Sequence, residues 1–121
     1  MKQRNDVILV GRIGQRLKYA LSSSGNEYAY FAMEIENQTH SSEWSNEYNQ
    51  ILHIMCFKRN VVKYMKAVNA HQGNIVVVFG YCSSFSSEIK GKELLQNAIN
   101  ATEIYVVKTK KDYEQPENKK Q

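Results

Sequence analysis

The chain lacks several features that would mark a membrane, secreted or disulfide-bonded protein. Its 121 residues include one proline and two cysteines, and no apolar run approaches the roughly 18 residues that a membrane span needs. The stretch MKQRND at the amino terminus has no apolar segment of the kind found in secretory signals. We therefore expect a soluble, cytoplasmic protein with no membrane partner. Cys56 and Cys82 lie far apart in strand-like segments, which favours buried thiols over a disulfide or a metal site.

Motifs for catalysis are also missing from the sequence. There is no glycine-rich phosphate loop and no nucleophile motif. The three histidines, His40, His53 and His71, fall in different predicted elements, so their shared presence is better explained by coincidence than by a site. We predict that the protein is not an enzyme and needs no cofactor and no metal.

Positive charge is scarce in the middle of the chain. The net charge is +4, but no Lys or Arg occurs between Lys18 and Lys58, and five glutamates fall in that gap. A basic excess concentrated in this way fits a polyanionic partner, although a solvated surface would give similar totals. Charge alone leaves both interpretations open.

The apolar pattern predicts five strands and one short helix. Alternating or continuous apolar residues indicate strands at about residues 7–13, 28–35, 51–57, 74–80 and 102–107. Val61, Tyr64, Met65 and Val68 recur at helical spacing. Asn60 is the predicted cap of this helix. Gly73 is expected to end the helix or to shape the turn that follows, and Gly91 to mark a hairpin tip.

The first predicted strand is unusual because Val7 to Val10 are four consecutive apolar residues. Such a run indicates burial on both faces of the strand, which is more apolar surface than the interior of one small barrel can absorb. An uncovered apolar edge invites another chain. We therefore expect at least a symmetric homodimer with this segment at or near the interface. Phe31 and Phe79 are assigned to the core.

The order of the elements, with one helix between strands three and four, is that of an all-β, five-stranded OB-fold Greek-key barrel. The folded domain is predicted to span residues 1–108. Residues 109–121 form a charged tail that contains the lone proline, and this composition predicts disorder.

Four segments of the sequence resemble the single-stranded DNA-binding protein (SSB) family. They are NDVILVGRIGQ at residues 5–15, YAYFAMEI at residues 28–35, ILHIMCF at residues 51–57 and NIVVVFG at residues 74–80. Their order and spacing match the family, and the resemblance covers residues 5–107. In this resemblance Gly11 lets the first strand bend, Gly14 serves a turn, and Arg12 projects toward the nucleic-acid groove.

The resemblance implies sequence-independent binding and protection of single-stranded DNA during replication, recombination or repair. Bases would stack on aromatic side chains, and Arg and Lys would contact phosphates. It also raises the expected assembly from a homodimer to a homotetramer, with replication or recombination proteins as further partners.

Two departures from the bacterial family pattern affect this interpretation. Ile51 and Leu52 occupy positions where bacterial members commonly have tryptophan and histidine, and the tail lacks an acidic, hydrophobic tip. The sequence is thus closer to phage or mobile-element members. An alternative function is that of an OB-fold protein-interaction module, such as a primosome-type replication component.

The predicted nucleic-acid contacts fall into a stacking group and a cationic group. Phe57 and Trp44 rank first for stacking, whereas Lys63 and Lys66 are assigned to the solvated face of the helix. The candidates for stacking are Tyr28, Tyr30, Trp44, Tyr48, His53, Phe57 and Phe85. The candidate cations are Arg12, Arg16, Lys18, Lys58, Arg59, Lys90 and Lys92.

Overall fold

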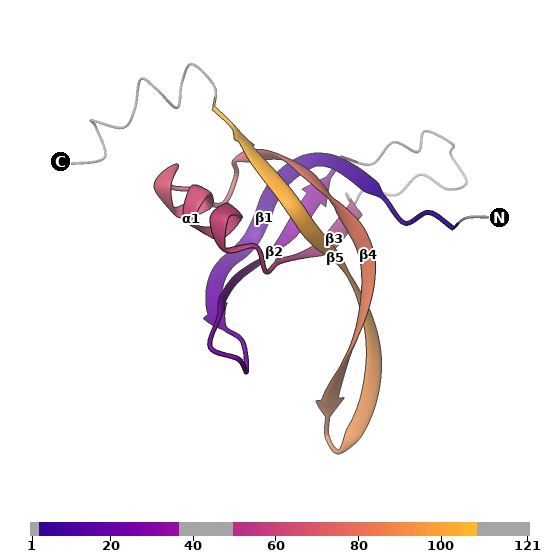
Figure 1. The fold of residues 1–121 in the computed structure, drawn as a ribbon. Helices are drawn as coiled ribbons and strands as arrows, with labels where there is room; N and C mark the ends of the chain where they lie inside the picture. Colours follow the sequence, from indigo (N-terminus) through magenta and orange to yellow (C-terminus); the bar gives the residue numbers. More distant parts are fainter. Residues whose placement is uncertain (1–2, 37–49, 109–121) are drawn as a thin grey trace, which may run out of the picture.

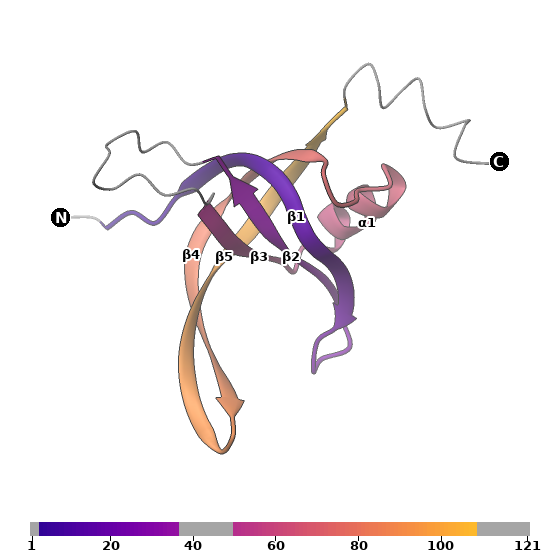
Figure 2. The ribbon, with the colours of Figure 1, turned by 180° about the vertical axis from the view of Figure 1, so that it is seen from behind.

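Five strand pairings, four antiparallel and one parallel, close a barrel in the order β1-β2-β3-β5-β4. The computed structural model describes residues 3–36 and 50–108, and Figures 1 and 2 show this part from opposite sides, with the helix at one end of the barrel. The elements are β1 (Val7–Leu21), β2 (Glu27–Ile35), β3 (Gln50–Cys56), α1 (Arg59–Ala67), β4 (Ile75–Ile89) and β5 (Lys92–Val107). The predicted all-β class, the five-stranded barrel and the helix between the third and fourth strands are confirmed. No helix in the described ranges is long and apolar enough to cross a membrane.

Strand β1 is longer than predicted because it serves two partners in succession. Its first half pairs with β4 and its second half with β2, so that Arg12 has a partner on both sides. The register against β2 shifts twice after Ile13, and Arg16 in this region has a φ of 57°. Gly14 therefore lies at an irregularity inside the strand, and its predicted role in a turn after the strand is wrong. A bulge bends and twists a strand without ending it.

The interior is filled from the inward-facing side of each strand and closed at one end by the helix. Residues of β2 up to Met33, and of β4 from Ile75 to Val78, alternate between inside and outside, as the pleat of a strand requires. The largest side chains that are almost completely buried are Phe31, Ile13, Met33, Ile54, Met65, Val76, Val78 and Cys56. From α1, Val61, Val62 and Met65 join this core. Burial of the Cys56 thiol raises its pKa.

One prediction about buried residues is wrong, and a second, the covering of both faces of the first strand, involves a partner chain and stays a prediction. Phe79 lies on the outer face, edge-on to Tyr105 with ring centroids 6.0 Å apart, because its neighbour Val78 points into the barrel. Ile8 and Val10 are 66% and 58% exposed, so only one face of the first strand is covered by the described part of the chain. Alternation in the pleat explains both results.

The helix is fixed to the barrel by hydrogen bonds from within it and from the turn that follows it. Its N-cap residue is Lys58, without a side-chain cap, so the predicted cap at Asn60 is wrong. The Tyr64 hydroxyl accepts a hydrogen bond of 2.9 Å from the Val106 backbone N–H. After the helix, Gly73 has a φ of 95° and donates its N–H to the Ile13 carbonyl over 2.7 Å. Its predicted role in shaping the turn is confirmed.

A long two-stranded hairpin formed by β4 and β5 extends well beyond the barrel (Figures 1 and 2). The pairing continues to Ile89 opposite Lys92, and the tip has positive φ at Lys90 and Gly91. The predicted tip is confirmed, but both strands are much longer than predicted. The register between β4 and β5 shifts at Gly80. The hairpin leaves the barrel beyond Cys82, whose partner Ile99 still pairs with Ile54 of β3.

We expect Gly80→Ala to destabilise the barrel by about 1–3 kcal/mol, the usual range for overpacking. A Cβ at this position would overlap the Asn100 carbonyl oxygen and lie 2.9 Å from the Ala101 Cα. Both contacts are backbone atoms, which cannot turn aside as a flexible side chain could. Thermal unfolding followed by circular dichroism measures the effect. Gly14→Ala is the matched control, because its nearest contact would be 3.1 Å away; equal melting temperatures for the two variants would contradict the expectation.

Candidate nucleic-acid interface

Three aromatic rings form a continuous surface on the outside of the barrel, called here the aromatic stack: Tyr28, Tyr30 and Phe57. The rings of Tyr28 and Phe57 stack with centroids 5.0 Å apart and an interplanar angle of 28°. Tyr30 adjoins Tyr28 with a centroid distance of 6.1 Å. Phe57 is 46% exposed. Such a surface offers the flat apolar faces on which bases can stack.

The register of the strands explains why these rings meet. Ala29 and Phe31 point into the core, so the tyrosines on either side of Ala29 point outward. Ala29 pairs with Cys56 of β3, and the residue that follows Cys56 therefore comes beside Tyr28. Three of the predicted stacking residues are thus brought together.

Two of the predicted cations adjoin the aromatic stack. Lys18 of β1 pairs directly with Tyr30, so both side chains lie on the same outer face. Arg59 lines a hollow together with Phe57. Lys58, by contrast, lines a separate hollow of about 490 Å³ between α1 and β5, with Tyr64 and Glu103.

Beyond the aromatic stack, the exposed surface extends along the outer face of β3, away from Phe57. Met55 pairs with Tyr30, and His53 pairs with Ala32. Farther along, Ile51 is exposed and lines a hollow of about 400 Å³ with His53, Cys82 and Ile99 at the base of the hairpin. Ile51 stands where the sequence departs from the family's tryptophan, so this part of the surface has aliphatic side chains and an imidazole where a large ring is common.

Other predicted contacts lie apart from the aromatic stack. Arg12 pairs with Glu34, at the opposite end of β2 from Tyr28, and its Nη1 donates a hydrogen bond of 3.1 Å to the Gly73 carbonyl. Phe85, Lys90 and Lys92 are exposed on the hairpin beyond the barrel. Trp44 and Tyr48 lie outside the described residues. Arg16, by contrast, is not distant from the stack: it occupies the irregular part of β1 between Gln15 and Lys18, which pair with Ala32 and Tyr30.

The first residue of β2 is fastened to α1 by a charged contact. Lys66 Nζ lies 2.6 and 2.7 Å from the two carboxylate oxygens of Glu27 and 4.8 Å from the centre of the Tyr19 ring. Burial, and secondarily the Glu27 charge, raise the pKa of Tyr19. Lys66 is exposed on the solvated face of the helix, as predicted, and in addition makes this structural contact.

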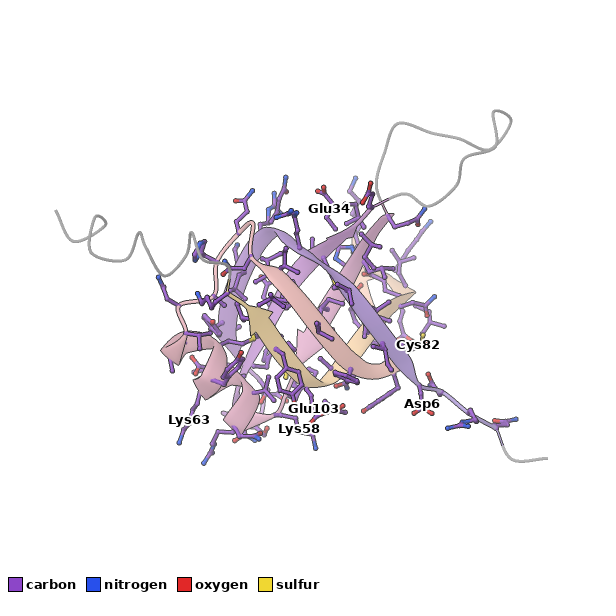
Figure 3. The ribbon with its side chains drawn as sticks, turned by 90° about the horizontal axis from the view of Figure 1, so that it is seen from above. Asp6, Glu34, Lys58, Lys63, Cys82 and Glu103 are labelled. Carbon is purple, nitrogen blue, oxygen red and sulfur yellow. The ribbon has the colours of Figure 1, made fainter. Side chains whose placement is uncertain are left out.

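Sequence reasoning missed Lys63 as a neighbour of the aromatic stack. Lys63 and Arg59 are exposed and line the same hollow of about 650 Å³ beside Phe57, and Figure 3 shows Lys63 on the helix side of the barrel, away from Cys82. The spacing of four residues from Arg59 places both side chains on one face of the helix. This spacing was the feature of the sequence that could have identified Lys63 as a candidate contact.

The two cysteines differ in exposure. Cys56 is buried, as predicted, whereas Cys82 is exposed, so the prediction of two buried thiols is wrong for Cys82. The Asn5 side chain makes two hydrogen bonds with the Cys82 backbone, of 2.8 and 2.9 Å. Among the described residues, no cluster of three or more His, Cys, Asp or Glu could hold a metal ion.

Comparisons with solved structures find the same fold in proteins of low sequence identity. The structure of a Plasmodium falciparum SSB in complex with single-stranded DNA matches with a TM-score of 0.71 and 16% identity, over 89% of this chain and 98% of that chain. A mitochondrial single-stranded DNA binding protein from S. cerevisiae matches with a TM-score of 0.66 and 16% identity, over 89% and 99%. The dimeric N-terminal domain of PriB from Thermoanaerobacter tencongensis matches with a TM-score of 0.61 and 21% identity, over 87% and 98%.

Comparison by sequence gives a more specific result. No curated protein matches the chain. The family model described as the single-strand binding protein family matches residues 4–112, which is nearly the whole chain and includes every described strand.

Proposed function

The chain belongs to the single-strand binding protein family, and from this premise we propose that it binds single-stranded DNA without sequence preference. Bases stack on the aromatic stack, while neighbouring Lys and Arg side chains contact the phosphates. Each stacked base contributes about 1–3 kcal/mol, a value general to this class of protein. The function requires no chemical step, so the protein acts as a binder and not as an enzyme.

The observation that carries the proposal is the exposed aromatic stack with cations on two sides. Lys18 pairs with Tyr30 at one end, and Arg59 adjoins Phe57 at the other. Aromatic faces flanked by positive charge are what unpaired bases and their backbone require. The Plasmodium falciparum relative of the same fold was solved with single-stranded DNA, which supports this assignment.

We extend the proposal to the remaining sequence predictions. The protein would protect single strands during replication, recombination or repair in the cytoplasm, with residues 1–108 as the binding domain and residues 109–121 as a tail. Arg12, Arg16, Lys58, Lys90, Lys92, His53, Phe85, Trp44 and Tyr48 stay predicted contacts along a longer path. The phage or mobile-element origin also stays a prediction.

We propose in addition that the protein assembles into a homodimer or homotetramer. Ile8 and Val10 of β1 pair with Phe79 and Val77 of β4, and Tyr105 of β5 pairs with Val77 in turn. Together these side chains make an apolar outer face that the described part of the chain leaves uncovered. A second copy of the same face would cover it. The dimeric PriB domain has the same fold, which supports association of such barrels.

The function is tested by titrating the protein into fluorescently labelled oligo-dT and following fluorescence anisotropy at increasing salt concentration. We expect tight binding at low salt, weaker binding to duplex DNA of equal length, and log K that falls with log salt by about 0.7 per phosphate contacted. Absence of binding at low salt would contradict the proposal. It would favour the alternative predicted from sequence, a protein-docking module.

A further inference from the structure

The hollow beside Phe57 differs from the other exposed surfaces in combining an aromatic wall, an apolar floor and two cations. It has a volume of about 650 Å³ and is lined by Leu21, Gly25, Asn26, Glu27, Phe57, Arg59, Val62 and Lys63. Volumes of about 300–1,000 Å³ are typical of sites for small organic groups. The hollow lies beside Phe57, the last ring of the aromatic stack. Single-stranded DNA whose base stacks on Phe57 would continue into it.

The charges in the hollow favour an anion. Arg59 and Lys63 are exposed, and neither makes an ion pair within residues 3–36 and 50–108. The carboxylate of Glu27 also lines the hollow, but Lys66 holds both of its oxygens at 2.6 and 2.7 Å. This pairing compensates the negative charge and leaves the two free cations to act on a ligand.

The shape of the hollow is set by ordered backbone. The loop from β1 to β2 is closed by hydrogen bonds from the Ser22 N–H to the Asn26 carbonyl over 2.8 Å and from the Gly25 N–H to the Ser22 carbonyl over 2.9 Å. On the opposite side, Val62 is buried in the core and fixes the face of α1 that carries Lys63. The two walls are joined by the contact between Glu27 and Lys66.

We infer that this hollow is a subsite for the sugar and phosphate of the nucleotide next to the base stacked on Phe57, with Lys63 as the phosphate contact. The inference rests on the proposed binding of single-stranded DNA and adds to it a place and a residue. Leu21, which is 71% exposed, provides apolar contact for the deoxyribose. Arg59 adds a second positive charge one helical turn from Lys63. The path of the bound DNA is thereby extended from the outer faces of β2 and β3 onto the helix.

The test compares Lys63→Gln with the full-length wild-type protein in the anisotropy titration with labelled dT30. We expect Lys63→Gln to bind about two- to fivefold more weakly, the range for an exposed ion pair. The slope of log K against log salt should fall by about 0.7, because one phosphate contact is lost. Lys63→Arg should restore affinity and slope.

Lys108→Gln is the matched control for loss of one positive charge. Lys108 follows Val107, which pairs with Ile75 of β4, away from the stack on β2 and β3. We expect this variant to keep the wild-type slope. If wild type binds dT30 but Lys63→Gln has unchanged affinity and slope, the subsite is refuted while the proposed function stands. If the wild-type protein itself does not bind dT30, the result contradicts the proposed function and not only the subsite.

A double-mutant cycle tests whether Lys63 and Phe57 act on adjacent nucleotides. When the base no longer stacks on Phe57, the phosphate of the next nucleotide is no longer held against Lys63. The combined loss in Phe57→Ala with Lys63→Gln should therefore be smaller than the product of the two single losses, by about twofold or more. If the loss of affinity in the double variant equals the product of the two single losses, the proposed coupling between Phe57 and Lys63 is refuted.

The pair of Glu27 and Lys66 provides an independent measurement. Lys66→Met leaves the Glu27 carboxylate uncompensated at the edge of the hollow, so it should weaken binding by about two- to fivefold. Adding Glu27→Gln should restore the affinity, because it removes the repelling charge. Unchanged binding by Lys66→Met, with a native circular dichroism spectrum, would show that no phosphate approaches Glu27 and would refute the subsite.

Discussion

Phe57→Ala is expected to weaken binding to single-stranded DNA by about 1–3 kcal/mol, or roughly 5- to 150-fold in Kd. The phenyl ring is 46% exposed and stacks on Tyr28 at 5.0 Å, so its removal takes away the widest accessible face of the aromatic stack. It also leaves Tyr28 without the ring that fixes its orientation. The measurement is the Kd for dT30 by anisotropy, at a salt concentration where wild type binds tightly.

Three further variants separate stacking from general damage. Phe57→Trp keeps a flat ring and should bind at least as well as Phe57→Leu, which keeps apolar bulk without a π face. Phe85→Ala removes a ring of similar exposure, 37%, from the distant hairpin and should leave the melting temperature unchanged. A Phe57→Ala protein that binds like wild type would show that the bases stack elsewhere. Trp44→Ala, expected from sequence to weaken binding as well, concerns a residue outside the described ranges.

The second large effect concerns assembly: Ile8→Glu combined with Val10→Glu should convert the assembled protein into a monomer of 14.0 kDa. These side chains are 66% and 58% exposed in the single chain and lie on the apolar outer face of β1. Two carboxylates placed there would face their symmetry-related copies across the interface, and burying unpaired like charges is strongly unfavourable. Multi-angle light scattering at micromolar concentration measures the mass.

The control for this experiment is Leu95→Glu on the hairpin. Leu95 is 76% exposed but lies beyond the barrel on β5, so the assembled mass should be kept. A wild-type protein with a mass of 14.0 kDa, both free and with oligo-dT, would contradict the proposed assembly. Circular dichroism should remain that of a folded barrel in the double variant, because neither position belongs to the core.

The fold could be predicted from sequence where strands bury one face. Ala29, Phe31 and Met33 alternate with outward residues, and all three are buried in the structure. The hairpin could not be traced in this way, because a two-stranded ribbon outside the barrel has little core to bury, and its serines gave no apolar period. The extension of β1 to Leu21 was hidden for another reason: irregularities near Gly14 and Arg16 look like breaks in the sequence but keep the strand paired.

The candidate site was predictable in composition but not in arrangement. Residue types indicated Tyr28, Tyr30 and Phe57 as stacking candidates, yet their contact depends on the pairing of Ala29 with Cys56. Register between strands separated by a long connection is set by the whole barrel and cannot be read from either segment alone. The importance of Lys63 depends on the packing of α1 against the barrel end, which a count of charges does not reveal.

The division of β1 between two partners has a consequence for how the chain is made in the cell. The segment from Val7 to Arg12 leaves the ribosome before its neighbour in β4, the segment from Ile75 to Gly80. At usual synthesis rates that interval is roughly 3 to 15 s, during which an apolar strand edge stays open. Open edges of this kind are templates for wrong pairing. Nascent chains on neighbouring ribosomes are therefore in most danger of aggregation before β4 emerges, and slower translation of the region between α1 and β4 should lower the soluble yield.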